Sequence, residues 1–296
     1  MNVNSNIISW VYNYLSDRPQ YTKLRGVKSS VRVINTGAPQ GCVLSPLLFT
    51  LYTNDCRSSY DDCSVFKYAD DTVIVGKICN DDSSNFLSQV DEFVRWCEIH
   101  YLNLNVKKTK EMIIDFRSSH KYVPQQIVMN NECVERVCEY KYLGIVIGDK
   151  LKGSVNNHQV YKKCRQGLHF LRVLGSIRVD NTILTLFFKS VIESVICFSI
   201  TTWYGRLTVK DKSKLRKIVK TAGRLGAQCS SLDELYYKYV TSQTRKIMDD
   251  VNHPLHNNYI FLRSGRRLAV PIGRTNRFMN SFIPKSIKLY NYMSTQ

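Results

Sequence analysis

Strand-forming patterns stop near Gly148. This break indicates that the chain has two successive parts with different secondary structure. Before the break, short apolar runs with the alternation of strands are interleaved with segments of helical spacing. After it, apolar residues recur at helical spacing and strand signals largely vanish. The pattern predicts an α+β domain over residues 1–149 and an all-α domain over residues 150–296, with the boundary in the polar segment Asp149–Asn157.

Turn and cap residues give approximate limits for the elements. Ser45 and Pro46 look like a helix N-cap followed by proline at the first helical position. In the first part we expect helices at Asn6–Leu15, Ser45 to about Asp55 and Asn85–Leu104, and strands at Lys23–Val33 (a pair turning at Lys28–Ser30), Ser64–Gly76 (a hairpin), Lys110–Phe116 and Tyr140–Ile147. In the second part we expect helices at Val160–Leu174, Thr182–Phe198, Lys210–Leu225 and Leu232–Val251.

The excess of positive charge is confined to the second part. Residues 1–150 hold 17 Lys and Arg against 17 Asp and Glu, whereas residues 151–296 hold 25 against 7, so the second part accounts for the whole net charge of +18. This segregation favours a polyanionic partner, most often nucleic acid, with an anionic membrane surface as the lesser alternative. A basic surface that serves only solubility stays open as a third interpretation.

One pair of adjacent aspartates has a setting that suggests chemistry. Four Asp-Asp pairs occur in the chain, but only Asp70-Asp71 is flanked on both sides by apolar strand residues, within the hairpin expected at Ser64–Gly76. Two carboxylates side by side repel each other unless cations neutralise them, and Mg²⁺ prefers such oxygen ligands. Taken alone, however, the pair fits a solvated hairpin turn better, so a metal site needs further context.

The order of several motifs supplies that context. GAPQGCVLSPLLF, which begins at Gly37, is followed by YADD at Tyr68–Asp71. Together they resemble the reverse transcriptase family, and within it the RNA-directed DNA polymerases of non-LTR (LINE-type) retrotransposons. LNLNVKKTKEM and EYKYLGIVIGD then resemble the next two motifs of that family in the same order. HQVYKKCRQGLHFLRVL and the basic segments after it resemble, less specifically, the thumb and the region that follows it.

The resemblance implies a partial right-hand polymerase, with an incomplete α+β palm, an all-α thumb and a basic helical C-terminal region. It assigns template and nucleotide contacts to one loop and one tyrosine: Gly37, Pro39, Gln40, Gly41 and Tyr68. It assigns Mg²⁺ binding to Asp70 and Asp71, and a catalytic role near the departing pyrophosphate to Lys108. It assigns the primer grip to Tyr142, Leu143 and Gly144. The implied partners are an RNA template and a DNA primer.

The match departs from the family in its acidic residues. In the family a further essential aspartate comes from an earlier F-x-D-x-x-x-x-F-D motif, and residues 1–36 hold only Asp17, which does not fit it. Two-metal phosphoryl transfer needs carboxylates that bridge both ions. We therefore expect the later part of a reverse transcriptase, without fingers or an endonuclease domain, that is inactive alone and binds Mg²⁺ weakly or not at all.

Basic residues of the second part form two groups that suit phosphate contacts. A helix at Lys210–Leu225 would place Leu215, Ile218, Val219 and Ala222 on one face and a basic row on the other: Lys210, Lys214, Lys217, Lys220 and Arg224. A second group contains Arg263, Arg266, Arg267, Arg274 and Arg277, interleaved with Tyr259, Phe261 and Phe278, which would stack on bases or belong to a core. We expect residues 151–296 to bind nucleic acid with a steep salt dependence, and residues 1–150 far more weakly.

Two other site types fit the residues poorly. Cys133 with Cys138, and His253 with His256, match no common zinc-ligand spacing. Residues around 150–190 weakly resemble a stretch at the start of an AlkB-type tRNA hydroxylase. That family needs an H-x-D…H iron triad, and none of the six histidines has an acid two residues on.

The sequence also bears on location and on the remaining alternatives. Residues 1–15 lack the basic region and cleavage site of a signal peptide, no uncharged apolar run is long enough to span a bilayer, and ten cysteines occur without regular spacing. We expect an intracellular protein of the nucleus or cytoplasm that is not secreted, with no membrane partner and no obligate protein partner. The alternative to a polymerase fragment is a non-catalytic nucleic-acid-binding remnant or domesticated retroelement protein, and an inert product is the third possibility.

Overall fold

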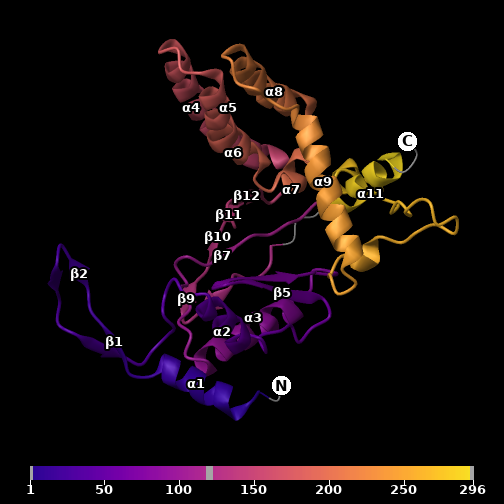
Figure 1. The fold of residues 1–296 in the computed structure, drawn as a ribbon. Coiled ribbons are helices and arrows are strands. Elements are labelled where there is room, and N and C mark those ends of the chain that lie inside the picture. Colours follow the sequence, from indigo (N-terminus) through magenta and orange to yellow (C-terminus); the bar gives the residue numbers. More distant parts are fainter. Residues whose placement is uncertain (1–2, 118–122, 294–296) are drawn as a thin grey trace. The chain divides into compact units, whose positions relative to one another are not determined.

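The chain folds as an α+β protein with two compact units (Figure 1). The computed structural model describes residues 3–117 and 123–293. The first unit comprises residues 1–106 with 123–133, and the second comprises residues 107–122 with 134–296. Residues 134–149 thus group with the helices by their contacts, while the domain boundary expected in Asp149–Asn157 stays a prediction.

The first unit begins with a helix and a projecting two-stranded ribbon. Helix α1 spans Ser5–Leu15, as expected. The ribbon consists of two antiparallel pairs: β1 (Arg18–Gln20) with β4 (Arg32–Ile34), and β2 (Lys23–Leu24) with β3 (Val27–Lys28). The chain reverses at Arg25-Gly26, so the turn expected at Lys28–Ser30 is wrong. Both Arg25 (φ 48°) and Gly26 (φ 89°) have positive φ, as two-residue hairpin turns require.

Helix α2 (Leu44–Tyr52) begins before the residue expected to cap it. Val43 is the N-cap, and it makes no side-chain capping bond. The Ser45 hydroxyl instead donates to the carbonyl oxygen of Pro39, at 2.5 Å. The prediction of Ser45 as N-cap is therefore wrong, because its side chain holds the preceding loop.

The hairpin expected at Ser64–Gly76 is confirmed. Strands β5 (Cys63–Tyr68) and β6 (Asp71–Gly76) pair antiparallel, and Tyr68 opposite Asp71 is the last pair before the turn. Helix α3 (Ser84–Ile99) packs on the hairpin, with the Phe86 ring directly against Gly76. The helix ends five residues earlier than expected. Tyr101 has a positive φ of 52° and cannot continue it. A small hairpin of β8 (Val128–Met129) and β9 (Glu132–Cys133) completes the strands of this unit.

The second unit opens with two short strand pairs. Strand β7 (Lys110–Glu111) pairs in parallel with β10 (Glu135–Arg136), and β11 (Glu139–Tyr142) pairs antiparallel with β12 (Ile145–Gly148). The expected strand at Lys110–Phe116 is wrong beyond Glu111, because its partner strand has only two residues. An ion pair between Arg136 Nε and the buried Glu111, at 2.9 Å, fixes this short pairing.

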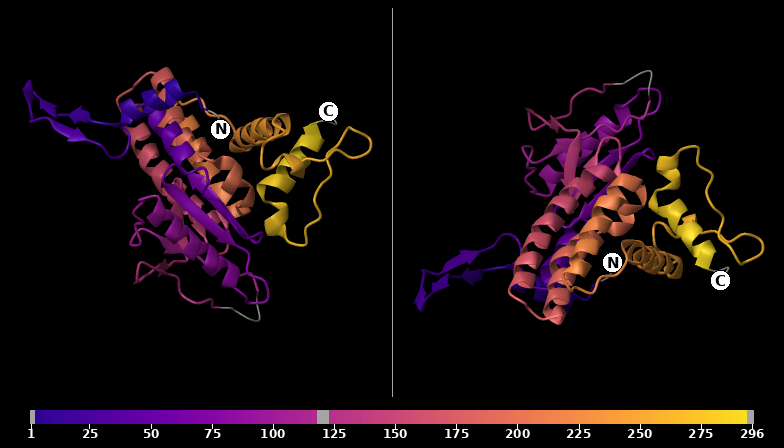
Figure 2. Two further views of the ribbon diagram at one scale, coloured as in Figure 1. Left: turned by 90° about the horizontal axis from the view of Figure 1, so that it is seen from below. Right: turned by 90° about the horizontal axis from the view of Figure 1, so that it is seen from above.

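Helices make up most of the second unit, as predicted for residues 160–250 (Figure 2). The segments are α4 (Gly153–Ser176), α5 (Asn181–Phe187), the π-helix η1 (Phe188–Glu193), α6 (Ser194–Cys197), α7 (Ile200–Trp203), the 3₁₀ helix η2 (Tyr204–Arg206), α8 (Val209–Arg224), α9 (Leu232–Asp249), the 3₁₀ helix η3 (His256–Asn258), α10 (Asn276–Met279) and α11 (Phe282–Met293). Helices α4 and α8 run side by side. Their core contains Leu171, Phe188, Ile192, Leu215, Tyr236 and Val240, each at most 2% exposed.

No single helix of the described chain is long and apolar enough to cross a membrane. Residues 181–197 and 200–206 reach that length and composition only as a pair bent by 44°. Ile192, Ile196 and Ile200, which lie in these two segments, are fully or almost fully buried within the helical core.

Candidate nucleic-acid site

The glycine-containing loop at residues 37–41 is fixed at its base and open along its length. Gly37 (φ 64°) and Gly41 (φ 78°) have positive φ, and a Cβ atom added to either would meet no atom within 4 Å. The guanidinium of Arg18 donates to the carbonyl oxygens of Thr36 at 2.6 Å and Gly37 at 2.8 Å. The Gln40 side chain is exposed. The loop therefore presents Gly37, Gln40 and Gly41 to solvent from a braced position, while Ala38 and Pro39 are half-buried.

The two aspartates lie where the β5–β6 hairpin reverses. Ala69 and Asp70 form the turn, and Asp71 begins β6. Ala69 has a φ of 52°, a conformation that costs an alanine energy and favours glycine. Tyr68, Asp70 and Asp71 are all exposed. The turn thus holds two solvated carboxylates beside an exposed tyrosine.

The described residues do not complete a two-metal site around these carboxylates. Nowhere in the described ranges do three or more His, Cys, Asp or Glu side chains converge to hold a metal ion. Asp17 instead faces Asn35, whose side-chain nitrogen lies 3.2 Å from its carboxylate. Asp55 lies 3.3 Å from the His100 ring. Within the described residues of the first unit, Asp70 and Asp71 would therefore be the carboxylate set, which falls short of what two bridging metal ions need.

Hydrogen bonds connect the parts of the first unit that carry these motifs. The Lys67 ammonium on β5 donates to the carbonyl oxygen of Thr53, which caps the C-terminal end of α2. The Tyr52 hydroxyl donates to the carbonyl oxygen of His100 at the end of α3, at 2.5 Å. The helix after the loop and the hairpin with the aspartates thus belong to one bonded framework.

The residues predicted to grip the primer form the turn of the β11–β12 hairpin. Leu143 (φ 45°) and Gly144 (φ 85°) reverse the chain between Tyr142 and its pairing partner Ile145. A Cβ atom on Gly144 would lie 2.9 Å from Cε1 of Phe198, so only glycine allows this approach of the turn to the helices. Lys108 is exposed in the segment before β7. All these residues belong to the second unit, and their grouping with Asp70 stays a prediction.

Helix α8 has the two faces predicted from its sequence. Leu215, Ile218 and Ala222 are buried in the core. The five predicted basic residues are exposed: Lys210, Lys214, Lys217, Lys220 and Arg224. Lys214 lies 3.4 Å from Asp211. The other four have no ion-pair partner among the described residues, so the basic row of α8 (these five residues) is mostly uncompensated.

A polar cluster at the start of α9 was missed from the sequence. Asp233 accepts a hydrogen bond from the buried Tyr204 hydroxyl at 3.1 Å and from Arg216 of α8 at 2.6 Å. The Lys212 ammonium lies 4.6 Å from the centre of the Tyr204 ring. Burial raises the pKa of Tyr204 and lowers that of Lys212. The cluster ties the basic helix α8 to α9, and no spacing in the sequence pairs residues so far apart.

The arginine-rich segment after α9 forms a loop of hairpin shape. Leu268 is 1% exposed, and the Asn291 side chain bonds both its N–H, at 2.8 Å, and its carbonyl oxygen, at 2.9 Å. Arg263, Arg266 and Arg267 are exposed near the reversal. Tyr259 is buried, and its hydroxyl bonds the Ser286 hydroxyl at 2.8 Å. Tyr259 is therefore a core residue and not a platform for bases.

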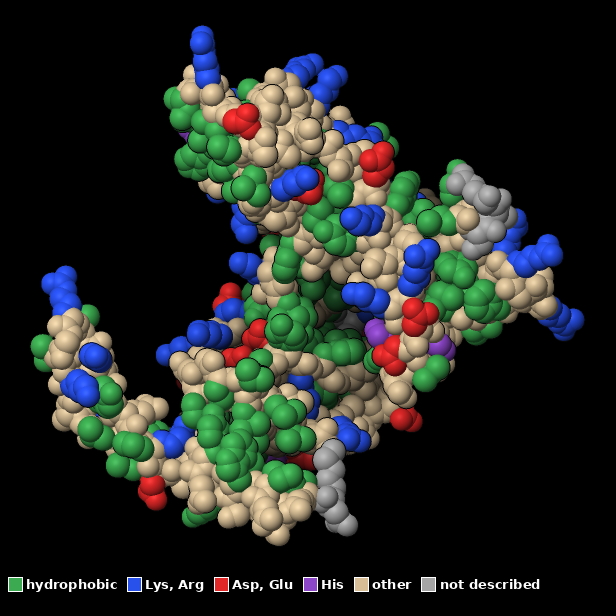
Figure 3. All heavy atoms as spheres, in the orientation of Figure 1, with side chains coloured by type: hydrophobic (Ala, Val, Ile, Leu, Met, Phe, Trp, Pro, Cys, Tyr) green, Lys and Arg blue, Asp and Glu red, His purple; other side chains and the backbone are tan. Residues whose placement is uncertain are grey.

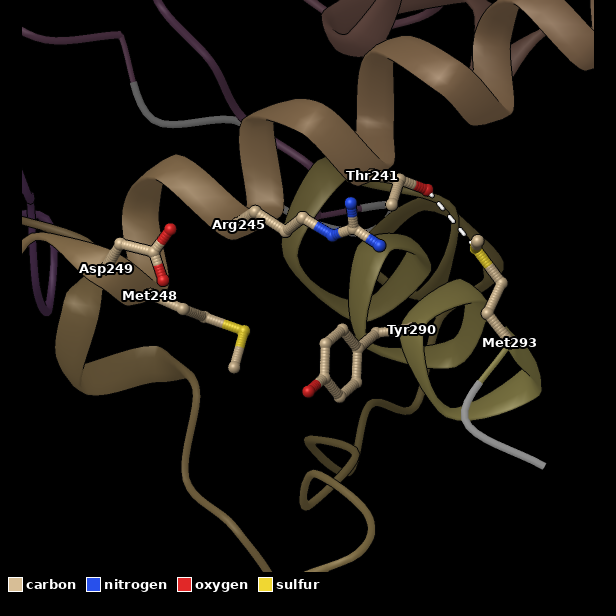
Figure 4. A pocket seen from close by; sticks show the side chains of 6 residues that line it. All are labelled: Thr241, Arg245, Met248, Asp249, Tyr290 and Met293. Carbon is tan, nitrogen blue, oxygen red and sulfur yellow. Dashed lines mark hydrogen bonds between the residues drawn. The ribbon is translucent and has the colours of Figure 1, made fainter. Parts of the chain in front are cut away.

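A hollow of about 400 Å³ lies between α9 and α11 (Figure 4). It is lined by Thr241, Arg245, Met248, Asp249, Tyr290 and Met293. Its two charged residues, Arg245 and Asp249, have opposite signs and lie one helical turn apart on α9. The hollow therefore offers no net charge, and none of the residues predicted to bind a ligand lines it.

Comparison with known proteins relates two segments of the chain to different families. Residues 1–147 match the family described as reverse transcriptase (RNA-dependent DNA polymerase). Residues 154–194, which cover most of α4 to η1, match the family described as alkylated DNA repair protein alkB homolog 8, N-terminal. The second match covers a helical segment without a metal-binding cluster among its described residues.

Individual relatives are polymerases of insect mobile elements. The chain is 28% identical over 171 residues to the probable RNA-directed DNA polymerase from transposon BS of Drosophila melanogaster, which covers 55% of this chain and 19% of that protein. It is 28% identical over 153 residues to the RNA-directed DNA polymerase from mobile element jockey of the same species, covering 49% and 16%. The matched stretch thus spans about a fifth or less of these relatives.

Proposed function

Residues 1–147 of this chain belong to the reverse transcriptase family, of the type found in LINE-like retrotransposons, and we propose that the chain acts as a nucleic-acid-binding part of such a polymerase. In this proposal the loop at residues 37–41 contacts template and nucleotide, and the β11–β12 turn contacts the primer. The helices after Gly148 form the thumb, and RNA template and DNA primer are the partners.

One observation carries the binding role: the basic row of α8 is exposed and largely free of acidic partners. Lys210, Lys217, Lys220 and Arg224 have no ion-pair partner in the described ranges, while the opposite face of the helix is buried. A rigid row of cations suits the regularly spaced phosphates of a nucleic acid. Counterion release from those phosphates would supply most of the affinity.

Catalysis by the chain alone is not part of this proposal. Phosphoryl transfer depends on metal ions that position the attacking hydroxyl and stabilise charge. Asp70 and Asp71 could hold Mg²⁺, but Asp17 lies beside Asn35 and Asp55 lies beside His100, so neither is free to supply a third carboxylate. We therefore expect weak Mg²⁺ binding and no primer extension.

The test combines a binding assay with a primer-extension assay on the full chain. The wild type should bind a primed RNA template with an affinity that falls steeply as salt rises. The triple variant Lys210→Gln, Lys217→Gln, Lys220→Gln should lower the slope of log affinity against log salt by about three. Lys246→Gln on α9, outside the row, serves as the single-charge control.

Two outcomes would contradict the proposal. A salt-independent signal, or an unchanged slope in the triple variant, would remove α8 from the interface. Robust nucleotide incorporation that disappears in Asp70→Asn would show that the chain completes a catalytic site by itself.

A further inference from the structure

The neutral charge of residues 1–150 conceals a strongly basic segment. Residues 18–54 contain no Asp or Glu, and five Lys or Arg residues fall within the ribbon β1–β4 at residues 18–34. These are Arg18, Lys23, Arg25, Lys28 and Arg32. Four of them, all except Arg18, are exposed and have no ion-pair partner among the described residues. The acidic residues that balance the first half lie elsewhere in it.

The ribbon places two of these cations directly opposite each other. In the β2–β3 pair, Lys23 faces Lys28 and Leu24 faces Val27. Opposed residues of an antiparallel pair project from the same face, so one face near the turn carries two ammonium groups and the other carries two apolar side chains. Like charges at opposed positions destabilise a strand pair. The free ribbon therefore carries a repulsion that a bound anion would relieve.

The base of the ribbon is fixed beside the loop that we propose for template contact. Arg18 bonds the carbonyl oxygens of Thr36 and Gly37, and Asp17 and Asn35 bond each other across the base. The reversal at Arg25-Gly26 then projects away from the rest of its unit, with cationic and apolar side chains along it (Figure 3). The cations therefore extend outward from the braced loop.

We propose that the ribbon at residues 18–34 is a second nucleic-acid contact, in which Lys23, Arg25 and Lys28 bind backbone phosphates. This inference rests on the proposed function, because the bound strand would be the one that the loop at residues 37–41 contacts. It also departs from the expectation that the first half binds nucleic acid far more weakly than the second, an expectation that the binding test below addresses as well. A local cluster of cations binds phosphates whatever the net charge of the surrounding domain.

The side chains favour a nucleic acid over an anionic membrane as the polyanion. Tyr21 is exposed and has the Lys28 ammonium 5.0 Å from its ring centre, which puts an aromatic ring among the phosphate-binding cations. Membrane insertion would depend on the apolar side chains of the ribbon, of which Leu24 and Val27 pair at the tip while Val31 and Val33 are exposed nearer its base. Four aliphatic side chains interleaved with five cations give little continuous apolar area for stable anchoring.

The test uses lysine acetylation of the full-length chain, read out by mass spectrometry, with and without a mixed-sequence RNA oligonucleotide. We expect the oligonucleotide to slow acetylation of Lys23 and Lys28 several-fold. Lys77 at the end of the β5–β6 hairpin, which is exposed outside the ribbon, should be unaffected. The variant Lys23→Gln, Lys28→Gln should lower the salt slope of binding by about two. This double variant also removes the repulsion between Lys23 and Lys28, so its thermal unfolding midpoint should not fall below that of the wild type.

The outcomes separate this inference from the proposed function. Protection of Lys210, Lys217 and Lys220 without protection of Lys23 and Lys28 would overturn the inference and leave the proposed function standing. Protection of none of these lysines would overturn both. Protection of the ribbon by phosphatidylserine vesicles but not by RNA would also overturn it, and Leu24→Ser, Val27→Ser would then abolish vesicle binding. With RNA, that apolar variant should bind as the wild type does.

Discussion

Nη2 of Arg18 lies 2.8 Å from the carbonyl oxygen of Gly37. The arginine begins β1, at the base of the projecting ribbon, and the glycine begins the open loop at residues 37–41. The same nitrogen also donates to Thr36, and Nε donates to the carbonyl oxygen of Leu15 at the end of α1. One guanidinium therefore joins the helix, the ribbon and the loop, and sets the direction in which the loop leaves the ribbon.

Replacing this arginine should loosen the loop. Arg18→Ala removes three hydrogen bonds from a charged donor to backbone carbonyls, so we expect the free energy of unfolding to fall by about 1–2 kcal/mol. Hydrogen exchange at the amides of Ala38, Gln40 and Gly41 should become several-fold faster. Arg25→Ala at the ribbon tip removes an equal charge without these bonds and is the control. Equal exchange rates in both variants would show that the loop keeps its conformation without the hydrogen bonds of Arg18.

The polar cluster at the start of α9 should matter more than its surface position suggests. Asp233→Ala leaves the buried Tyr204 hydroxyl and Arg216 without their acceptor, which should cost about 1–3 kcal/mol in the free energy of unfolding. Glu234→Ala removes a carboxylate from the same first turn but breaks no bond, and should cost a few tenths of a kcal/mol. Urea unfolding of both variants measures the difference. Similar losses would mean that only the helix dipole is involved.

Two glycines of α4 should respond to alanine in opposite directions. A Cβ atom on Gly167 would lie 2.8 Å from Cγ1 of Ile192 in the π-helix, whereas one on Gly175 would meet nothing within 4 Å. Gly167→Ala should therefore destabilise the chain by about 1–3 kcal/mol through overpacking. Gly175→Ala should stabilise it by up to about 1 kcal/mol, because alanine favours helix. Thermal unfolding of the two variants measures the difference. Destabilisation by both would contradict the expectation that alanine stabilises the helix at position 175.

Periodicity predicted the elements that bury a regular face. The hairpin around Asp70 and the two-faced helix around Leu215 are both confirmed. Their apolar residues repeat at strand or helix spacing because one face of each element is buried. The net charge of each half located the excess positive charge correctly. It did not reveal the five cations of the ribbon, because acidic residues elsewhere in the first half cancel them in the sum. The absence of Asp and Glu from residues 18–54 was the signal that would have revealed them.

Long-range partners decided the features that the sequence could not predict. Ser45 fits an N-cap by its neighbours, but the loop carbonyl of Pro39 takes its hydroxyl. Lys110–Phe116 has strand composition, but only Lys110 and Glu111 find a pairing partner. Tyr204 and Asp233 are 29 residues apart and meet only when the helices pack. The last two cases depend on contacts distant in the sequence, and Ser45 on one with a residue six positions earlier.

Cys42, the residue after the open loop, carries the most specific pH prediction. Its sulfur lies 2.9 Å from the Ser45 hydroxyl and 2.8 Å from the Tyr14 hydroxyl, and it accepts from the Ser45 N–H at 3.2 Å. The hydrogen bond with the Ser45 side chain, and then that with Tyr14, lower the pKa of the Cys42 thiol from 9.0 to about 7. The folded chain thus binds fewer protons here than the unfolded chain between pH 7 and 9. This group adds stability that is complete above pH 9 and is lost as the pH falls through 7.

The rate of alkylation by iodoacetamide should follow the thiolate, because only that form attacks. At Cys42 the rate should rise with pH and reach half its maximum near pH 7. Ser45→Ala and Tyr14→Phe each remove a hydroxyl that stabilises the thiolate, so the midpoint should move upward and the rate at pH 7 should fall. Cys97 is buried and its pKa is raised to about 11, which makes it a slow internal reference in the same digest. A midpoint near 9 in the wild type, unchanged by either variant, would show that neither hydroxyl stabilises the thiolate in solution.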